Sequence, residues 1–230
     1  MKKQSFTTSY SGGKDSALAL YRTIKEGHIP QSLLITYRED QQRSWFHGIP
    51  GELLEEVSTA LEIPIRKIYA GPGEDYTAAF IEALREEREK GAAFCVFGDI
   101  DIEDHRSWCR EVCKKAGLEA YHPLWQESRE SLVQEVIQEG FVANITTLDT
   151  TRLDKRFLGE ALSPEIAEEI RRCGADVCGE NGEYHTFVSN GPIFHRPISF
   201  TLGAVEEHGN YACRPLSPLK VFEKTGLTIV

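Results

Sequence analysis

Alternation between short apolar runs and helical periodicity is the feature that most constrains how this chain can fold. Four strand-like runs occur in the first half, and each is followed by a helical pattern. The strand-like runs cover residues 4–10, 32–37, 64–69 and 94–97. The helical patterns cover residues 15–26, 52–61, 76–90 and 103–116. Strands that alternate with helices predict an α/β fold, a parallel twisted sheet with helices on both faces and right-handed crossovers.

The pattern changes near residue 123, so we expect one domain over residues 1–122 and a second over residues 123–230. The second part mixes helix and strand signals, which predict a smaller α+β domain. Its helical patterns cover residues 131–139 and 163–173. Its strand-like runs cover residues 141–146, 193–202 and 210–222, with a turn at residues 206–209. We expect the substrate site in the cleft between the two domains.

The charge balance bears on the partners of the chain. Its 36 acidic and 26 basic side chains give a net charge of −10, which argues against a broad basic surface for nucleic acid but leaves a small RNA-binding patch open. No apolar run reaches the roughly 20 residues of a membrane span, and the N-terminus contains no apolar signal core. We therefore expect a cytoplasmic protein with no membrane partner. A homodimer is compatible with the sequence.

The six cysteines do not form a recognisable metal motif. Cys109 and Cys113 lie one helical turn apart, which favours a shared helix face. Cys173, Cys178 and His185 offer ligand atoms for a metal, but their spacing matches no zinc template. We expect neither a zinc site nor disulfides, because a cytosolic chain with a large core needs none.

A compact motif follows the first strand-like run and opens the first helical pattern. It consists of Ser11, Gly12, Gly13, Lys14, Asp15 and Ser16. The two glycines permit positive φ angles and a close backbone approach to an anion, and the N-terminus of the following helix favours phosphate. The serine hydroxyls add hydrogen-bond donors, and the lysine adds a positive charge. We interpret this segment, the phosphate loop, as the binding site for nucleotide phosphates.

Asp15 is the one member of the phosphate loop that repels phosphate, and a bridging Mg²⁺ would resolve the repulsion. The alternative is a Gly-Gly turn into a helix in which Asp15 is only a favourable N-terminal charge. The spacing differs from the Walker pattern Gly-x-x-x-x-Gly-Lys-Ser/Thr, so the chain is not a P-loop enzyme of that kind.

The phosphate loop resembles the Ser-Gly-Gly-x-Asp-Ser motif of the N-type ATP pyrophosphatases, or PP-loop enzymes. The resemblance implies an adenine nucleotide alpha-hydrolase-like, Rossmann-like fold in which the motif binds the pyrophosphate part of ATP. It also implies that a substrate oxygen attacks the α-phosphate, which releases pyrophosphate and leaves an adenylated intermediate.

A larger part of the chain, from about residue 6 to about residue 200, resembles the diphthine–ammonia ligase branch of this group. The main signature is residues 176–188, Asp-Val-Cys-Gly-Glu-Asn-Gly-Glu-Tyr-His-Thr-Phe-Val, continued by residues 191–194. Shorter matches are Phe46-His47, Gly98-Asp99-Ile100, Cys113, Gly117-Leu118 and Pro123-Leu124-Trp125.

The second resemblance implies a ligase that adenylates a carboxylate with ATP and lets ammonia displace AMP, which forms a primary amide. In the family the carboxylate belongs to diphthine, a modified histidine of translation elongation factor 2. Residues 101–108 depart from the Ser-x-Tyr-Gln-Arg of archaeal and eukaryotic members and resemble a bacterial variant. ATP and ammonium are therefore expected substrates, whereas the carboxylate acceptor, a protein side chain or a small molecule, stays open.

Carboxylates gather where the fourth strand-like run ends, at the end of a parallel strand where ligands bind. They are Asp99, Asp101, Glu103 and Asp104. We expect Asp99 to contact the nucleotide and Asp101 to hold Mg²⁺ together with Asp15. Glu103 and Asp104 are alternatively helix-start residues that the helix dipole favours.

Basic side chains follow these carboxylates. Arg106 is our candidate for the catalytic cation that stabilises charge on the reacting phosphorus, with His105 second, although both also suit a solvated helix face. His47 is a candidate nucleotide contact or a packing histidine. Gly98 either lets the backbone approach the nucleotide or forms a simple turn.

Glu180 and Glu183 flank Asn181-Gly182, a pair typical of a tight turn. With the resemblance, we assign both carboxylates to the half of the site that handles nitrogen, where one binds ammonium and accepts its proton. The alternative is a solvated hairpin tip. His185 and Thr186 are further candidates to orient the substrate.

Two other functions compete with the ligase. A transferase that modifies tRNA through an adenylated base would share the chemistry, but the chain is acidic and lacks the Cys-x-x-Cys pairs common in thiolating relatives. A non-catalytic adenine-nucleotide sensor is disfavoured by the intact Lys14 and Asp15 and by the acidic strand end.

Overall fold

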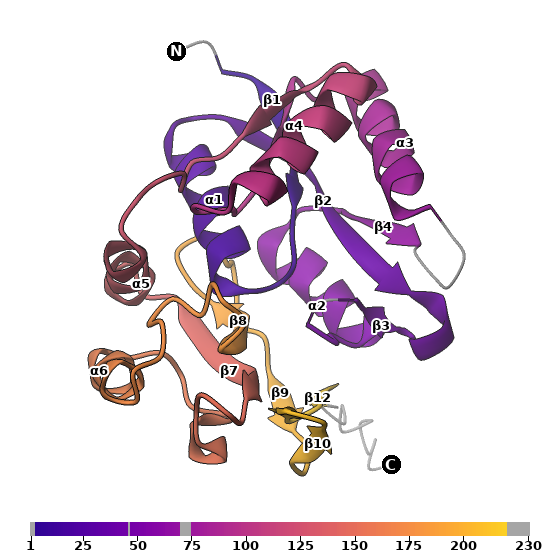
Figure 1. Cartoon of the computed structure of the whole chain (residues 1–230). Helices are drawn as coiled ribbons and strands as arrows, with labels where there is room; N and C mark the ends of the chain where they lie inside the picture. Colours follow the sequence, from indigo (N-terminus) through magenta and orange to yellow (C-terminus); the bar gives the residue numbers. More distant parts are fainter. Residues whose placement is uncertain (1–2, 46, 70–74, 220–230) are drawn as a thin grey trace, which may run out of the picture.

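A five-stranded parallel sheet forms the centre of the first half of the molecule (Figure 1). The computed structural model describes residues 3–45, 47–69 and 75–219. The strand order is β4–β2–β1–β5–β6, and a short strand β3 (Arg43–Ser44) pairs antiparallel with the end of β2. The parallel strands are β1 (Ser5–Ser9), β2 (Ile29–Arg38), β4 (Ile65–Tyr69), β5 (Phe94–Val96) and β6 (Glu119–Tyr121).

Helices cover both faces of this sheet, as the alternation predicts. Side chains alternate along each strand, so Leu33 and Ile35 belong to the core beneath α1 and α2, whereas Leu34 belongs to the core beneath α3 and α4. The helices are α1 (Lys14–Lys25), α2 (Gly51–Leu61), α3 (Tyr76–Glu89) and α4 (Glu103–Ala116). The predicted α/β class with a mostly parallel central sheet is confirmed.

The strand order places a natural binding site at the centre of the sheet. From β1 the chain first builds outward through β2 to β4, and it then returns to the other side of β1 to form β5 and β6. The loops after β1 and β5 therefore diverge at the carboxyl edge of the sheet, and ligands of open α/β sheets bind at such a switch point. The phosphate loop and Gly98 lie in these two loops.

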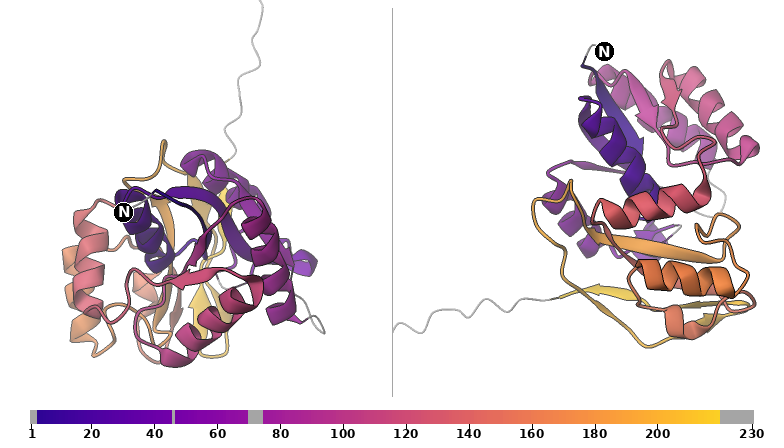
Figure 2. Two further views of the ribbon diagram at one scale, coloured as in Figure 1. Left: turned by 90° about the horizontal axis from the view of Figure 1, so that it is seen from above. Right: turned by 90° about the vertical axis from the view of Figure 1, so that its left-hand side faces the viewer.

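The second half is built around a smaller antiparallel sheet with the order β10–β11–β7–β8. Figure 2 shows this half beneath the parallel sheet in its right-hand view. The helices are α5 (Arg129–Gln138) and α6 (Pro164–Arg172), and a two-stranded ribbon pairs β9 (Phe200–Leu202) with β12 (Leu216–Pro218). The sheet strands are β7 (Val142–Asp149), β8 (Tyr184–Asn190), β10 (Glu206–His208) and β11 (Tyr211–Cys213), and the short 3₁₀ helices are η1 (Glu39–Gln41) and η2 (Lys155–Phe157).

Sequence-based assignments were wrong or incomplete at several places in the two halves. The strand expected at residues 193–202 shrinks to β9, because Pro197 has no N–H to offer a ladder. Residues 206–208 form strand β10 rather than a turn, since the hairpin turns at Gly209 (φ +63°) and Asn210. Strand β6 of the parallel sheet was missed because its sequence, Glu-Ala-Tyr, contains no continuous apolar run. Residues 220–222, expected as strand, lie outside the described residues.

The two halves share one hydrophobic core. Phe6 of β1, Leu18 of α1, Phe187 of β8 and Ile145 of β7 belong to a single cluster of buried side chains. The division at residue 122 stays a prediction. No helix within the described residues is both long and apolar enough to span a bilayer.

Candidate functional site

The phosphate loop has the geometry of an anion-binding backbone. Gly12 adopts φ +86°, and a Cβ there would lie 2.4 Å from Ile49 Cδ1. Gly13 is the N-cap of α1, and Ala17 N–H donates to Gly13 O at the start of the helical ladder. No acceptor is found for the N–H groups of Asp15 and Ser16 among the residues the structure describes. The loop therefore fits a phosphate group, which would satisfy these donors.

The two serines of the phosphate loop hold each other in place. Their hydroxyl oxygens lie 3.2 Å apart, and Ser16 Oγ donates to Gly13 O at 2.9 Å. Ser11 Oγ accepts the N–H of Gly13 at 3.3 Å. Ser11 and Ser16 both line the cavity described below, and in this structure their hydroxyl protons are engaged within the loop.

Gly98 makes a close backbone approach to the phosphate loop, while its expected approach to the nucleotide stays a prediction. A Cβ at Gly98 would lie 2.9 Å from Ser16 N and 3.1 Å from Asp15 O. No side chain fits there without moving the backbone of the loop. The absence of a side chain at this position brings the end of β5 against the start of α1.

A cavity of about 450 Å³ opens between the phosphate loop, the end of β5 and the start of α4. Asp15 and Glu180 both line it, although 165 positions separate them in the sequence. The other lining residues are Ser9, Ser11, Ser16, Tyr76, Phe97, Gly98, Asp99, Asp104, His105, Trp108 and Cys109. The space is concave, mixed polar and aromatic, and located at the switch point of the sheet, as expected of a ligand site.

Lys14 does not project freely from the loop. Its side chain is 5% exposed, and Nζ donates to both oxygens of Asp15, at 2.7 and 3.0 Å. Burial alone would lower the pKa of Lys14, but Asp15, Cys178 and Tyr184 raise this pKa well above its usual value. The lysine is therefore charged, and it partly neutralises Asp15 at the edge of the cavity.

His47 supports the phosphate loop from the outside. Because its partner is a carbonyl, Nδ1 donates, and Thr186 O accepts at 2.8 Å. A Cβ at Gly13 would lie 2.6 Å from the His47 ring, so the ring packs directly on the loop. Burial, with His185 nearby, lowers the pKa of His47 to about 3, which leaves the ring neutral at pH 7. His47 thus has a packing role in this structure, while Phe46 lies outside the described residues.

The carboxylates after β5 separate into two environments. Asp99 lines the cavity, where burial raises its pKa. Asp101 is not among the lining residues. Both of its oxygens accept from Arg129, at 2.7 and 2.8 Å, and this hydrogen bonding lowers the pKa of Asp101. Asp99 is therefore the better-placed of the two for a ligand in the cavity.

Arg129 links two distant segments, and the sequence reading missed it. Besides Asp101, its guanidinium donates to Asp176 Oδ2 at 2.6 Å. One arginine at the start of α5 thus connects the end of β5 with the loop before β8. An arginine in the first turn of a helix is an ordinary surface residue by sequence, so no pattern distinguished it.

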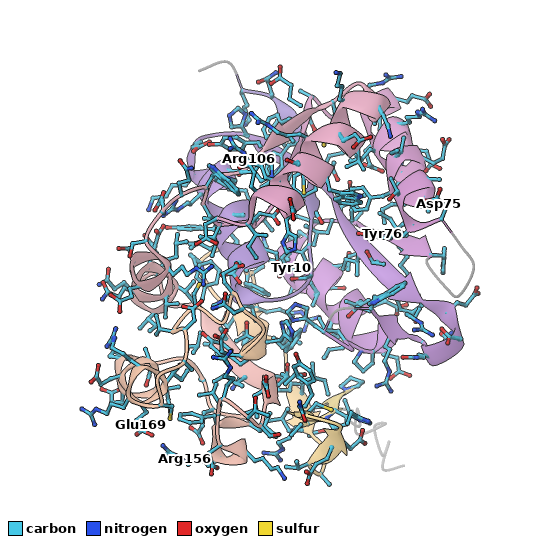
Figure 3. All side chains as sticks on the ribbon, viewed as in Figure 1. Tyr10, Asp75, Tyr76, Arg106, Arg156 and Glu169 are labelled. Carbon is cyan, nitrogen blue, oxygen red and sulfur yellow. The ribbon has the colours of Figure 1, made fainter. Side chains whose placement is uncertain are left out.

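Arg106 is turned toward Trp125 rather than toward the cavity. Its guanidinium carbon lies 4.3 Å from the centre of the Trp125 ring, and Nη1 lies 3.7 Å from Glu103. Arg106 is not among the lining residues, whereas His105 and Asp104 are. In Figure 3 Arg106 is labelled on α4 and Tyr76 at the start of α3. The assignment of Arg106 as a catalytic cation stays a prediction.

Residues 176–183, the acidic loop, hold the two predicted glutamates in different places. Glu180 lines the cavity, and burial together with the charge of Asp15 raises its pKa to about 7. Glu183 is 3% exposed and accepts hydrogen bonds from the N–H groups of Asn181 and Asp176, at 3.0 and 3.4 Å, and from Asn181 Nδ2 at 3.2 Å. Glu180 thus faces the ligand space, and Glu183 holds the turn behind it.

Aromatic side chains that the sequence reading did not single out form one wall of the cavity. The rings of Tyr76 and Trp108 stack with centroids 5.4 Å apart at 5°, and Phe80 packs on Trp108 at 5.1 Å. Tyr76 comes from the start of α3 and Trp108 from the middle of α4, and they meet only because those helices share one face of the sheet. Such a surface suits a flat or apolar part of a ligand.

Two models of one protein family match most of the chain. Residues 4–120 match the family model of the diphthamide synthase N-terminal domain, and residues 128–211 match that of the diphthamide synthase C-terminal domain. The diphthine–ammonia ligase of Rattus norvegicus is 27% identical over 235 residues, which cover 92% of this chain and 88% of the relative. That of Bos taurus is 28% identical over 238 residues, which cover 93% and 89%.

A solved structure described as a predicted subunit of tRNA methyltransferase from Methanocaldococcus jannaschii is also similar. It aligns over 85% of this chain and 100% of its own, at 18% identity with a TM-score of 0.44. A likeness this distant supports no conclusion about the present chain.

Proposed function

Because the chain belongs to the diphthamide synthase family, we propose that it is an ATP-dependent ligase that adenylates a carboxylate and converts it into an amide with ammonia. The names of its relatives, diphthine–ammonia ligases, support this activity. The observation that carries the proposal is that Asp15 of the phosphate loop and Glu180 of the acidic loop line one cavity.

ATP is the nucleotide for which the phosphate loop is suited. The free N–H groups at the start of α1 form a set of donors for its pyrophosphate portion, and the hydroxyls of Ser11 and Ser16, which now bond within the loop, would join them on reorientation. Asp15 and Asp99, which both line the cavity, offer the oxygen ligands that Mg²⁺ prefers. When bound, Mg²⁺ would neutralise charge that develops on the phosphates. Asp101, paired with Arg129, holds the acidic loop in this proposal.

In the first half reaction, an oxygen of the substrate carboxylate bonds to the α-phosphorus of ATP, and the bond from that phosphorus to the pyrophosphate breaks. The N–H groups of the loop stabilise the charge that pyrophosphate carries away. Lys14 is already paired with Asp15, so we assign it a role in fixing that carboxylate rather than in direct contact with phosphate.

In the second half reaction, ammonia attacks the carbonyl carbon of the adenylate, and AMP leaves as the C–O bond breaks. Ammonium must first lose a proton, and Glu180 is placed to accept it. Its pKa of about 7 lies much closer to that of a useful base than the ordinary value for glutamate. We assign Glu183 a positioning role, since its hydrogen bonds shape the turn that presents Glu180.

The acceptor that best fits the family is diphthine on a protein, the substrate named for the relatives. Residues 101–108 differ from the archaeal and eukaryotic pattern, and four positions in or beside this stretch, Asp104, His105, Trp108 and Cys109, line the cavity. These four residues are the part of the cavity where selectivity for a carboxylate substrate other than diphthine would arise. Assembly into a homodimer and location in the cytoplasm stay predictions.

The test supplies the protein with ATP, Mg²⁺, an ammonium salt and elongation factor 2 carrying diphthine. We expect AMP and pyrophosphate by chromatography and conversion of the carboxylate to the amide by mass spectrometry. ADP as the main product would defeat the adenylation chemistry. AMP formation with another carboxylate, but not with diphthine, would show that the acceptor is a different molecule and would still support the ligase activity.

The two competing functions receive less support. A nucleotide sensor has no need for a carboxylate of raised pKa beside its phosphate loop, whereas this chain has such a carboxylate in Glu180. The transferase would need a surface for tRNA, and the net charge of −10 gives no broad one.

A further inference from the structure

We propose that Asp99, Cys109 and His122 form a binding site for a divalent cation of the zinc type in the wall of the active-site cavity. The three residues come from separate segments: the end of β5, the middle of α4 and the end of β6. This site goes beyond the proposed ligase function, which needs only Mg²⁺ at the phosphates.

The distances suit a tetrahedral metal. Cys109 Sγ lies 3.6 Å from Asp99 Oδ2, and His122 Nε2 lies 3.9 Å from the same oxygen. One ligand atom from each of the three residues lies within 4.8 Å of the other two. Ligands of a tetrahedral Zn²⁺ stand roughly 3.3–3.6 Å apart, because Zn–N and Zn–O are about 2.0 Å and Zn–S about 2.3 Å. The two distances to Asp99 are already close to these values, and the third separation, bounded at 4.8 Å, would have to shorten by up to about 1 Å on binding.

His122 is the independent sign of a missing partner. Its side chain is 5% exposed, and Nε2 is buried with no hydrogen-bond partner within the part of the chain that the structure describes. The ring stacks on Phe97 with centroids 5.4 Å apart, and Nε2 lies 3.9 Å from Asp99 Oδ2. A buried polar nitrogen without a partner costs about 1–3 kcal/mol, and a bound metal would remove this cost.

The donor set selects the class of cation. A thiolate, an imidazole and a carboxylate are typical ligands of Zn²⁺, whereas Mg²⁺ prefers oxygen ligands only. Binding displaces the thiol proton of Cys109, as in other zinc–cysteine sites. The ion has a route of entry, because Asp99 and Cys109 both line the cavity.

A fourth ligand is available on the cavity side. His105 is exposed, and its Nδ1 lies 3.6 Å from Asp99 Oδ1. A metal held here would share Asp99 with the magnesium site proposed above. Zinc and magnesium–ATP are therefore expected to bind in competition, so that zinc lowers the apparent affinity for ATP.

Co²⁺ is the probe for this site, because its thiolate complexes absorb in the near ultraviolet and its tetrahedral complexes absorb strongly in the visible. The full-length protein, reduced and stripped of metal by a chelator, is titrated with Co²⁺ in the absence of nucleotide. We expect one equivalent to give both bands and Zn²⁺ to abolish them. Cys109→Ser should remove the thiolate band, and His122→Phe, which preserves the stacked ring, should weaken Co²⁺ binding at least about tenfold.

Two variants serve as matched controls. Cys113→Ser alters the neighbouring buried thiol of α4, and Cys213→Ser alters the second group of potential ligands, Glu206, His208 and Cys213. Both should retain the bands. No thiolate band in the wild type, or a band that survives Cys109→Ser and disappears in Cys213→Ser, would overturn the proposal. If circular dichroism shows that Cys109→Ser does not fold, the Co²⁺ affinity of His122→Phe tests the proposal instead. Ligase activity is not part of this test, so the two proposals fail separately.

Discussion

The phosphate loop at the start of α1 and the acidic loop before β8 face one cavity, the first mainly through backbone N–H groups and the second through the carboxylate of Glu180. The phosphate loop depends on what is absent: side chains at Gly12, Gly13 and Gly98 would collide with neighbours at 2.4, 2.6 and 2.9 Å. The acidic loop depends on what is present, a set of hydrogen bonds from Arg129, Asn181 and the backbone to Asp176 and Glu183.

This difference separates two demands on the enzyme. Backbone dipoles do not titrate, so a site made from them binds phosphate equally well over a wide pH range. A carboxylate with a shifted pKa can exchange a proton, but its behaviour depends on the charges around it. Nucleotide binding and ammonia chemistry should therefore respond differently to mutation and to pH, and the predictions below use that contrast.

The largest effect is expected at Asp15. Asp15→Asn removes the charge that faces the phosphates while keeping the shape, and we expect magnesium-dependent formation of AMP to fall about a hundred- to a thousandfold. Asp101→Asn is the control, since Asp101 is bound to Arg129 and does not line the cavity. Near-normal turnover of Asp15→Asn would remove this residue from the mechanism.

The next largest effect separates the two half reactions. Glu180→Gln should reduce amide formation about a hundredfold, while exchange of pyrophosphate into ATP, which reports adenylation alone, changes little. Loss of both activities together would place Glu180 in nucleotide binding. Glu183→Gln is the comparison: it should lower the free energy of unfolding by about 1–2 kcal/mol, because one of its carboxylate acceptors becomes a donor that faces N–H groups.

A third expectation concerns pH. Burial, Asp15 and, to a smaller extent, Asp101 raise the pKa of Glu180 to about 7. Lys14 and Arg129 act in the opposite direction. Below pH 7 the carboxyl is protonated and accepts no proton, so amide formation should rise with pH through about 7 and then level off. Pyrophosphate exchange should lack this step. A step of equal size in both reactions would assign the titration to the nucleotide half.

The same raised pKa has a consequence for stability, with the opposite sign to a salt-bridged carboxylate. The folded protein binds this proton more tightly than the unfolded chain, so stability is lost as pH rises from the ordinary glutamate value toward 7. Wild type should therefore be less stable than Glu180→Gln at pH 8 and similar to it at pH 4.5, as measured by urea unfolding at both values. The reverse order would show that the carboxylate is stabilised in its charged form.

The smallest effect is expected at Arg129. Arg129→Lys keeps the charge but replaces the planar guanidinium, which spans both oxygens of Asp101 and Asp176, with a compact ammonium that lacks this fork geometry. We expect a loss of about 1 kcal/mol in unfolding free energy and a modest drop in amide formation, with ATP binding unchanged. ATP affinity measured by calorimetry checks the last point, and a clear weakening would show that the acidic loop also shapes the nucleotide site.

Local sequence patterns were sufficient to predict most of the fold and to identify some of the residues that line the cavity. Periodicity predicted the helices of the parallel half because each buries one regular face, and the phosphate loop was visible because its glycines and helix start are adjacent in sequence. Strand β6 and the β10–β11 hairpin were missed or misplaced, since β6 and β10 lack the continuous apolar run that identified the equally short β5.

The parts of the site that sequence reasoning did not reach are those made by tertiary packing. Tyr76 and Trp108 become one surface only when α3 and α4 pack together, and Arg129 acquires its role only when α5 approaches two loops. The separation of Glu180 from Glu183 also depends on which side of a turn faces solvent. Burial of this kind has no signature in a single sequence.

Support of the phosphate loop by β8 has a consequence for how the protein folds. Lys14 N–H donates to Thr186 Oγ1 across 172 positions of sequence, and Val188 N–H donates to Gly12 O at 2.9 Å. Contacts of such separation form late, because a long stretch of chain must first be ordered. During synthesis, the N-terminal half therefore emerges without a finished nucleotide site. ATP that binds only after β8 has docked would stabilise the completed chain by mass action, and a chain that ends before residue 184 would gain nothing from it.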